Sequence, residues 1–148
     1  MYTVTKRMEI SAAHYLVLDY ESKCEHLHGH NWIISVTCQA ETLDRNGMVV
    51  DFGEVKAIAK RHVVDVWDHA FLAYRGDTAV VSFLQGIPGH KTVLLDVVPT
   101  AENLAHIAFA RLDAVYRDTY GNHLQLEQVR LYETPNCWVD ATRPGENG

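Results

Sequence analysis

The chain has 148 residues and a formal net charge of −6, and these values bound its class. The length predicts one domain spanning residues 1–148, which buries about two thirds of its unfolded surface. Hydrophobic residues at 47% and charged residues at 22% are typical of an ordinary folded domain. The negative charge disfavours nonspecific binding to nucleic acid or to a membrane surface. It still allows an anionic substrate, because basic side chains could gather locally at Lys6, Arg7, Lys23, Lys56, Lys60 and Arg61.

The length of the apolar runs and the number of cysteines indicate the cellular compartment of the protein. Residues 1–6 lack the apolar core of a signal peptide, and no later stretch reaches the length of a membrane span. Cys24, Cys38 and Cys137 are odd in number and have unrelated spacings, so we expect reduced thiols and no disulfide framework. The expected location is therefore cytoplasmic.

The N-terminal half reads as strands followed by a helix. Apolar residues alternate with polar ones through residues 2–13, which predicts a strand with His14 at its exit. Residues 15–27 read as a loop, and alternation resumes from His28 to Ala40 with His28 and His30 on the face of Trp32. A turn at residues 44–47 precedes a short third strand at residues 48–50. Asp51 is then expected to cap a helix that ends near residue 68.

The C-terminal half adds helices and a last pair of strands. Residues 77–85 read as a short helix, and Thr100 caps the longest helix, which Gly121 stops. Residues 124–133 read as a strand, residues 137–140 can continue the sheet, and residues 143–148 read as a frayed tail. The order of elements predicts an α+β fold, an antiparallel sheet with two long helices on one face. The edges of such a sheet need cover, so a homo-oligomer is expected.

Three histidines form a candidate metal site. His28 and His30 lie two apart on one strand and therefore share a face, and His14 can reach them from the preceding strand. Three neutral nitrogens with an open fourth position are typical of catalytic zinc. Cys24, four residues before His28, can be a fourth ligand or a nearby base. Alternatively, these are solvated histidines at a strand start.

Other polar residues each have a structural interpretation when read alone. Asp68-His69 is typical of a helix end, and Glu133 is typical of a solvated strand end. Thr100 and Glu102 are typical residues at the start of a helix.

Several motifs, taken in order, closely resemble one known family. The resemblance is to the family of 6-pyruvoyltetrahydropterin and 6-carboxytetrahydropterin synthases, and it covers almost the whole chain. The motifs that carry it are Ser11-Ala12-Ala13-His14, Cys24, Leu27-His28-Gly29-His30-Asn31, Gly47-Met48-Val49-Val50-Asp51-Phe52, Asp68-His69, Pro99-Thr100-Ala101-Glu102-Asn103 and Glu133-Thr134.

This resemblance implies a fold, a cofactor and a substrate. The fold is the tunnelling fold, in which subunits assemble into an oligomeric β-barrel, commonly a hexamer made as a dimer of trimers, with active sites between subunits. His14, His28 and His30 would bind Zn²⁺, and the substrate would be 7,8-dihydroneopterin triphosphate. The ion would hold hydroxyls of the pterin side chain and acidify them and the adjoining C–H bonds.

The resemblance also implies roles for individual residues. Cys24 matches the proton acceptor, and His69 matches the second proton-transfer residue. Asp68 lies beside His69 in sequence, whereas Glu133 is the expected partner in space, because adjacent residues rarely point at each other. Glu133 would also accept hydrogen bonds from the pterin ring.

The same resemblance also implies roles for Thr100 and Glu102 and indicates which product the enzyme forms. Thr100 and Glu102 match positions that line the pterin pocket. The short spacing from Cys24 to His28 and the pair Asp51-Phe52 look like the carboxy-forming members, which release acetaldehyde and triphosphate and supply queuosine synthesis. The alternatives are a pyruvoyl-forming enzyme and a pterin- or zinc-binding module without turnover. Residues 74–97 are longer than in the smallest members, and the sequence offers no chemical reason for this.

Overall fold

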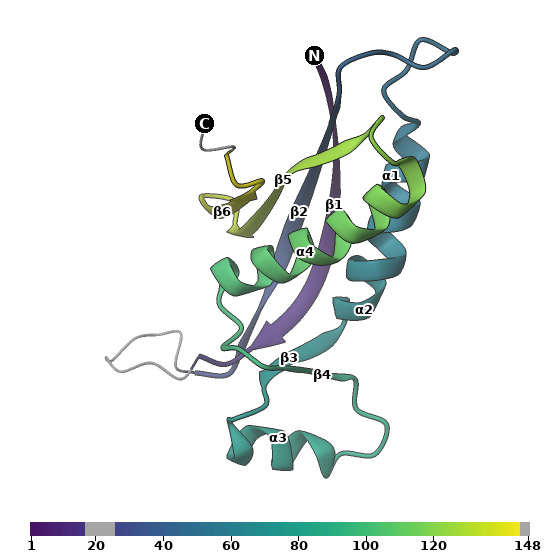
Figure 1. The fold of residues 1–148 in the computed structure, drawn as a ribbon. Helices are drawn as coiled ribbons and strands as arrows, with labels where there is room; N and C mark the ends of the chain where they lie inside the picture. The colour runs from purple at the N-terminus through teal and green to yellow at the C-terminus, as the bar shows by residue number, and fades with distance from the viewer. Residues whose placement is uncertain (17–25, 146–148) are drawn as a thin grey trace.

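A computed structural model describes residues 1–16 and 26–145, and within them the chain forms one mixed sheet with helices on one main face (Figure 1). The strand order is β4-β3-β1-β2-β5-β6. The strands are β1 (Tyr2–His14), β2 (His28–Ala40), β3 (Ala70–Tyr74), β4 (Thr92–Leu95), β5 (Gln125–Thr134) and β6 (Cys137–Thr142). The helices are α1 (Phe52–Ala59), the π-helical turn η2 (Lys60–Val64), α2 (Asp65–Trp67), α3 (Thr78–Gln85) and α4 (Ala101–Tyr120).

The two longest strands form the centre of the sheet. β1 and β2 pair antiparallel over their full length, from Tyr2 opposite Ala40 to His14 opposite His28. β5 continues the antiparallel sheet beside β2, and β6 pairs with β5. The α+β class and the predicted strands at residues 2–13, 28–40 and 124–133 are therefore confirmed.

Two short strands depart from the expected antiparallel pattern. β3 pairs parallel with β1 through Ala70, Phe71 and Leu72, and β4 pairs parallel with β3. The strand expected at residues 48–50 is wrong. Val49 and Val50 are buried in the core, yet they lie in the irregular segment before α1. A run of apolar residues indicates that a segment is buried, but a buried loop and a buried strand both have such a run.

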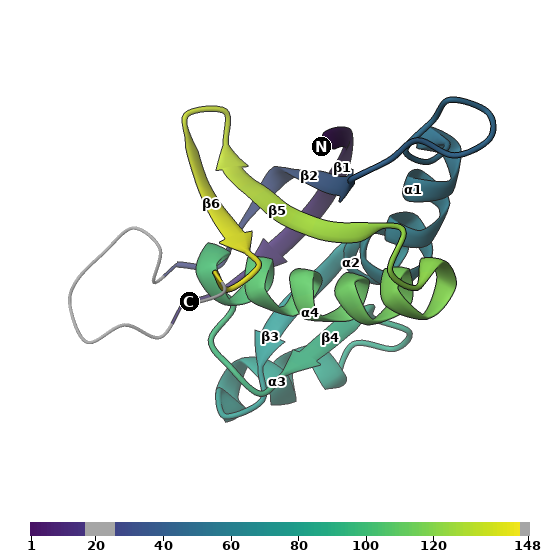
Figure 2. The ribbon, with the colours of Figure 1, turned by 45° about the horizontal axis from the view of Figure 1, so that its top comes forward.

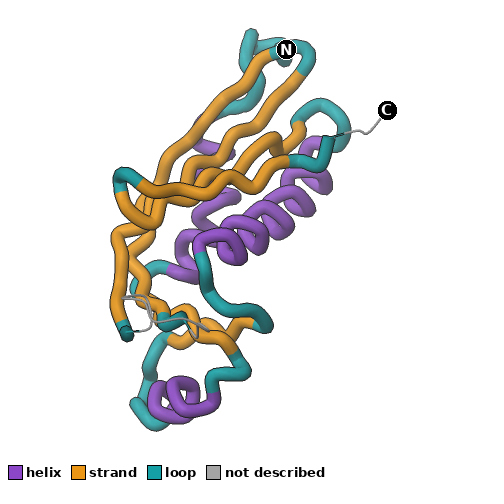
Figure 3. The backbone as a smooth tube through the Cα atoms, turned by 90° about the vertical axis from the view of Figure 1, so that its left-hand side faces the viewer, coloured by secondary structure: helices purple, strands orange, loops and turns teal. Residues whose placement is uncertain are grey.

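The long helices cover one face of the sheet, as Figure 3 shows. Asp51 caps α1 by accepting from Gly53 N, and Thr100 caps α4 by accepting from Asn103 N, as predicted. Gly121 ends α4 with a φ of 61°, a conformation that glycine adopts without steric cost. Tyr116 locks the two helices together because its buried hydroxyl donates to the carbonyl of Val55 at 2.9 Å. None of the described helices is both long and apolar enough to cross a membrane.

Residues 74–97 build a small extension on the other face. α3 lies with β3 and β4 at the end of the molecule away from the N-terminus (Figure 1, Figure 2). Leu84 of α3 packs with Phe71 and Ala73 of β3 in a second apolar cluster. The long segment therefore widens the sheet and brings its own cover.

The C-terminal tail is ordered further than expected. The Arg143 side chain donates to the carbonyl of Leu126 at 2.8 Å and to the carboxylate of Asp113 on α4. The expectation of fraying is wrong at Arg143, because this side chain ties the end of β6 to β5 and α4.

Substitutions at two separate cysteines test whether Cys38 belongs to the hydrophobic core. Cys38 is fully buried on the helix-covered face, and burial raises the pKa of its thiol to about 12. Cys38→Ser should lower the free energy of unfolding by about 2 kcal/mol, because the new hydroxyl is buried at an apolar position that offers it no hydrogen-bond partner among the described residues. Cys137→Ser, at an exposed position, is the control and should change it by less than about 0.5 kcal/mol. Equal effects in urea unfolding would contradict the core assignment.

Candidate metal centre and catalytic residues

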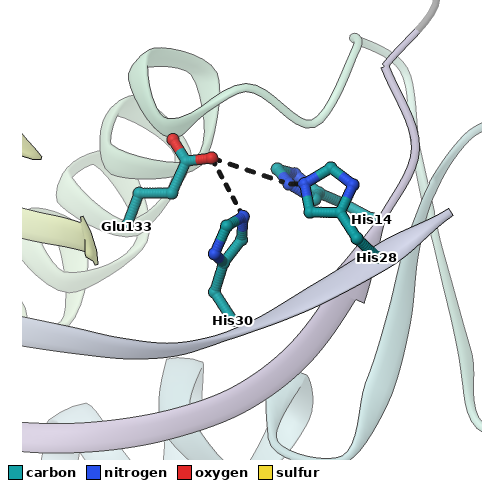
Figure 4. Close-up of side chains that lie close together, drawn as sticks. All are labelled: His14, His28, His30 and Glu133. Atoms are coloured by element: carbon teal, nitrogen blue, oxygen red, sulfur yellow. Dashed lines mark hydrogen bonds and ion pairs between the residues drawn. The ribbon is translucent and has the colours of Figure 1, made fainter. Parts of the chain in front are cut away.

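Three histidines and one glutamate meet where β1 ends and β2 begins (Figure 4). His14 Nε2 lies 2.9 Å from His28 Nε2. Glu133, near the end of β5, places Oε1 3.0 Å from His30 Nε2 and 3.8 Å from His14 Nε2. One donor atom from each residue lies within 4.8 Å of the others. The structure thus brings together the three predicted ligands and places the carboxylate of Glu133 beside them.

Backbone carbonyls orient two of the imidazoles. His14 Nδ1 bonds to the carbonyl of Pro99 at 2.8 Å, and His28 Nδ1 bonds to the carbonyl of His26 at 2.6 Å. A carbonyl only accepts, so the proton sits on Nδ1, and the neutral ring turns an unprotonated Nε2 toward the centre. Trp32 packs beneath, with its ring centroid 5.1 Å from that of His14 and 5.2 Å from that of His30. These second contacts fix both the tautomer and the direction of the donors.

Burial favours the neutral form of two of the imidazoles, those of His14 and His30. Desolvation, helped by the neighbouring His28 and His30 and opposed by the Pro99 carbonyl, lowers the pKa of His14 to about 4. Desolvation also lowers the pKa of His30, although Glu133 opposes this shift. A metal ion needs neutral imidazole nitrogens, so burial supplies these two ligands ready at neutral pH.

One buried atom supports the fit to a metal ion. His30 Nε2 is buried without an aligned hydrogen bond among the described residues, even though Glu133 lies near it. A buried polar atom without a partner costs about 1–3 kcal/mol unless something satisfies it. Three imidazole nitrogens and one carboxylate oxygen are ligands that a divalent transition metal prefers. The residues present therefore fit such an ion.

Asp68 and His69 form a separate pair where α2 gives way to β3. His69 Nδ1 lies 2.9 Å from Asp68 Oδ2, and Asp68 Oδ1 accepts from Ser11 N at 2.9 Å. The Ser11 amide, and after it His69, hold the pKa of Asp68 below its usual value. Within one chain His69 contacts Asp68, its neighbour in sequence, whereas Glu133 lies beside His30. At this contact His69 has a φ of 59°, a backbone conformation that is uncommon outside glycine.

The sheet separates this pair from the metal centre. His69 borders a hollow of about 290 Å³ whose lining includes Ala13, Gly29 and Phe71. Ala13 and Gly29 face each other in the ladder, one residue before His14 and one residue after His28. Neighbouring residues in a strand point to opposite faces. The hollow therefore opens on the face opposite the metal centre, and one chain does not bring His69 to the imidazole cluster.

The remaining predicted residues have varied surroundings. Thr100 accepts from Asn103 N at 3.2 Å as the cap of α4, directly after the residue that holds His14. Glu102 is exposed in the first turn of α4. Cys24 lies outside the described residues.

Four of the basic side chains named from the sequence lie around one hollow, together with acidic side chains. A hollow of about 410 Å³ beside β1 and the first helices is lined by both signs of charge. Its charged residues are Lys6, Arg7, Lys56, Lys60, Glu9, Asp65 and Asp68.

Sequence reasoning missed Pro99 and Trp32 as supports of the site. Trp32 carried a signal, since it shares the parity of His28 and His30 along β2. Pro99 acts through its backbone carbonyl, which no side-chain pattern reports.

Comparison with known proteins assigns the family. The family model described as 6-pyruvoyl tetrahydropterin synthase matches residues 3–144. The chain belongs to the 6-pyruvoyl tetrahydropterin synthase family. A relative named 6-carboxy-5,6,7,8-tetrahydropterin synthase from Rickettsia bellii is 33% identical, over 95% of this chain and 99% of its own. A relative of the same name from Haemophilus influenzae is 28% identical, over 95% of this chain and 98% of its own.

Solved structures agree with the family assignment. The 6-pyruvoyl tetrahydropterin synthase of Caenorhabditis elegans has a TM-score of 0.68 and 25% identity, and the match covers 97% of this chain and 96% of that one. An uncharacterized protein from Wolinella succinogenes has a TM-score of 0.82 at 21% identity, with 97% and 98% covered, which shows the fold alone. The expected tunnelling fold is confirmed for the single chain, and membership in this synthase family makes the chain an enzyme.

Metal analysis tests the centre. The purified protein should hold about one divalent metal ion per chain, and His30→Ala should lose most of it because a ligand nitrogen is removed. His106→Ala, at an exposed position on α4, is the matched control and should keep the ion. Full metal content in the His30 variant, measured by elemental analysis, would contradict the assignment.

Proposed function

We propose that the chain converts 7,8-dihydroneopterin triphosphate and one water molecule to 6-carboxy-5,6,7,8-tetrahydropterin, releasing acetaldehyde and triphosphate. This lyase reaction would supply queuosine and 7-deazaguanine synthesis in the cytoplasm. The observation that carries the proposal is the cluster of His14, His28, His30 and Glu133 in a member of this synthase family. The names of the matched relatives favour the carboxy product.

Zinc is the proposed cofactor. His14, His28 and His30 would hold it through Nε2, and burial favours the neutral form of His14 and His30. When bound, zinc would act as a Lewis acid that acidifies the side-chain hydroxyls of the pterin and the C–H bonds beside them. The chain's own contribution is to present the three donors with their tautomers already set by Pro99 and His26.

Glu133 is proposed to bind the pterin ring. Its carboxylate has two oxygens, which suit the paired N–H donors of a pterin. Oε1 lies 3.0 Å from His30 Nε2, and the side chain is one quarter exposed, so the carboxylate is close to the ion site and open to a ligand. Thr100 and Glu102, at the start of α4, are proposed to line the same pocket.

Cys24 and His69 are proposed to move protons. Loss of triphosphate and rearrangement of the side chain require a base that takes a proton from carbon and an acid that returns one. Cys24 would be the acceptor, since nearby positive charge lowers the pKa of a thiol. Asp68 supports His69 by accepting from Nδ1, which leaves Nε2 free to exchange a proton with substrate.

A complete site would then combine residues from two copies of the chain. The metal centre and His69 lie on opposite faces of the sheet, so another copy must supply one of them. Both sides of the antiparallel part offer edges: β6 is an outer strand, and β1 pairs with β3 only at Ala12–His14 in the described residues. Such edges favour association. We propose a homo-oligomer, a hexamer built as a dimer of trimers.

The second candidate is formation of 6-pyruvoyltetrahydropterin. The name of the matching family and that of the Caenorhabditis elegans neighbour favour this reaction. A binding module without turnover is the third reading. The hydrogen bond between Asp68 and His69 argues against it, because a module that only binds has no use for an oriented imidazole.

Product analysis separates these candidates. Incubation with 7,8-dihydroneopterin triphosphate, followed by mass spectrometry, should yield 6-carboxy-5,6,7,8-tetrahydropterin with acetaldehyde and triphosphate. Cys24→Ala should keep its metal while turnover falls by roughly a hundredfold or more. Cys38→Ala, at a buried structural thiol, is the control and should keep the rate per folded site. A pyruvoyl product would contradict the main proposal, and unchanged substrate would contradict both reactions.

A further inference from the structure

Lys91 joins the segment before β4 to the turn that carries Asp68 and His69. Its Nζ donates to the carbonyl of Asp68 at 2.6 Å and to that of Asp65 at 2.8 Å. The Lys91 carbonyl accepts from Phe71 N at 3.0 Å, so the backbone of Lys91 is fixed beside β3. A cation is favoured at the carbonyl end of a helix, and both carbonyls lie in the last turn and cap of the continuous helical stretch α1-η2-α2.

The turn needs such a restraint because His69 has an unfavourable backbone conformation. Its φ of 59° lies in the left-handed region, which a residue with a Cβ seldom adopts. The peptide unit between Asp68 and His69 is gripped at both ends. Lys91 holds its oxygen, and its N–H donates to the carbonyl of Ser11 at 2.6 Å. Rotation of this one peptide would turn the imidazole away from its present direction.

We infer that Lys91 is a positioning residue, which holds the peptide between Asp68 and His69 so that the imidazole meets the Asp68 carboxylate and presents Nε2 to the hollow. This inference rests on the proposed role of His69 in proton transfer. It also gives the long segment of residues 74–97 a function, since Lys91 belongs to that segment.

A matched control exists on the same pair of strands. Arg75 donates to Asp96 at 3.0 Å, which is another cation contact between β3 and β4, at the other end from the His69 turn. Lys91→Met and Arg75→Met each remove one cation from this small extension. Only the first should disturb Asp68 and His69. Lys91→Arg retains a donor that can reach carbonyls and should restore part of what Lys91→Met loses.

Activity gives the first readout. Lys91→Met should lower kcat about tenfold to a hundredfold while KM changes less than about threefold, because a misplaced proton-transfer group affects the reaction more than binding. Metal content should stay at the wild-type level, since the metal centre lies on the other face. Arg75→Met should leave kcat within about twofold. Equal losses in the two variants would show a general stability effect and overturn the inference.

Amide hydrogen exchange gives a second readout that needs no substrate. Lys91→Met should speed exchange at the amides of His69 and Ser11, which the turn protects, while amides of the β1–β2 ladder keep their rates. The ¹⁵N shifts of the His69 ring should show loss of the Nδ1–H tautomer. If the Met variant does not fold, Lys91→Gln takes its place, with one donor group for two carbonyls.

The activity and exchange measurements together distinguish failure of the proposed function from failure of the inference about Lys91. An inactive wild-type protein contradicts the proposed function, and exchange together with the tautomer then decides the role of Lys91. Unchanged exchange at His69 and Ser11 overturns the inference whatever the activity. Faster exchange with unchanged kcat in an active enzyme also overturns it, because the clamp would then be structural only.

Discussion

The ladder between β1 and β2 is the constraint on which the rest of the site depends. It sets His14 opposite His28 and Ala12 opposite His30, so three imidazoles share the face that the helices cover. The same two-residue period sends Ala13 and Gly29 to the other face, where they line the hollow next to His69. A shift of the register by one residue would exchange these faces and remove the metal centre.

Short-range patterns predicted the long elements of the fold. Alternation over thirteen residues in each of β1 and β2, and the caps Asp51 and Thr100, are local signals that tertiary packing did not override. β3 and β4 could not be predicted in the same way. Five and four residues show little periodicity, and their parallel pairing depends on β1, which lies more than fifty residues earlier in the chain.

Spacing predicted that the three histidines would meet, since His28 and His30 must share a face and His14 ends the preceding strand, and the family resemblance favoured a metal site over solvated histidines. The supports of the site were less accessible to sequence reasoning. The backbone carbonyl of Pro99 accepts from His14, and the side chain of Lys91 donates to the backbone carbonyl of Asp68. Both contacts join residues that lie far apart in the sequence. The contact of Asp68 with its neighbour His69 occurs where His69 has a positive φ, which is uncommon outside glycine and is not visible in a residue pattern.

We propose that a working site takes its three histidine ligands from one copy of the chain and His69 from another. Co-expression of His28→Ala with His69→Asn tests it, because asparagine tolerates the left-handed backbone of His69. Each variant alone should be inactive. Randomly mixed oligomers, verified by native mass spectrometry, should regain roughly a quarter of the wild-type sites if two copies share each site. Mixed oligomers that stay inactive, or a fully active monomer of the wild-type chain, would contradict the claim.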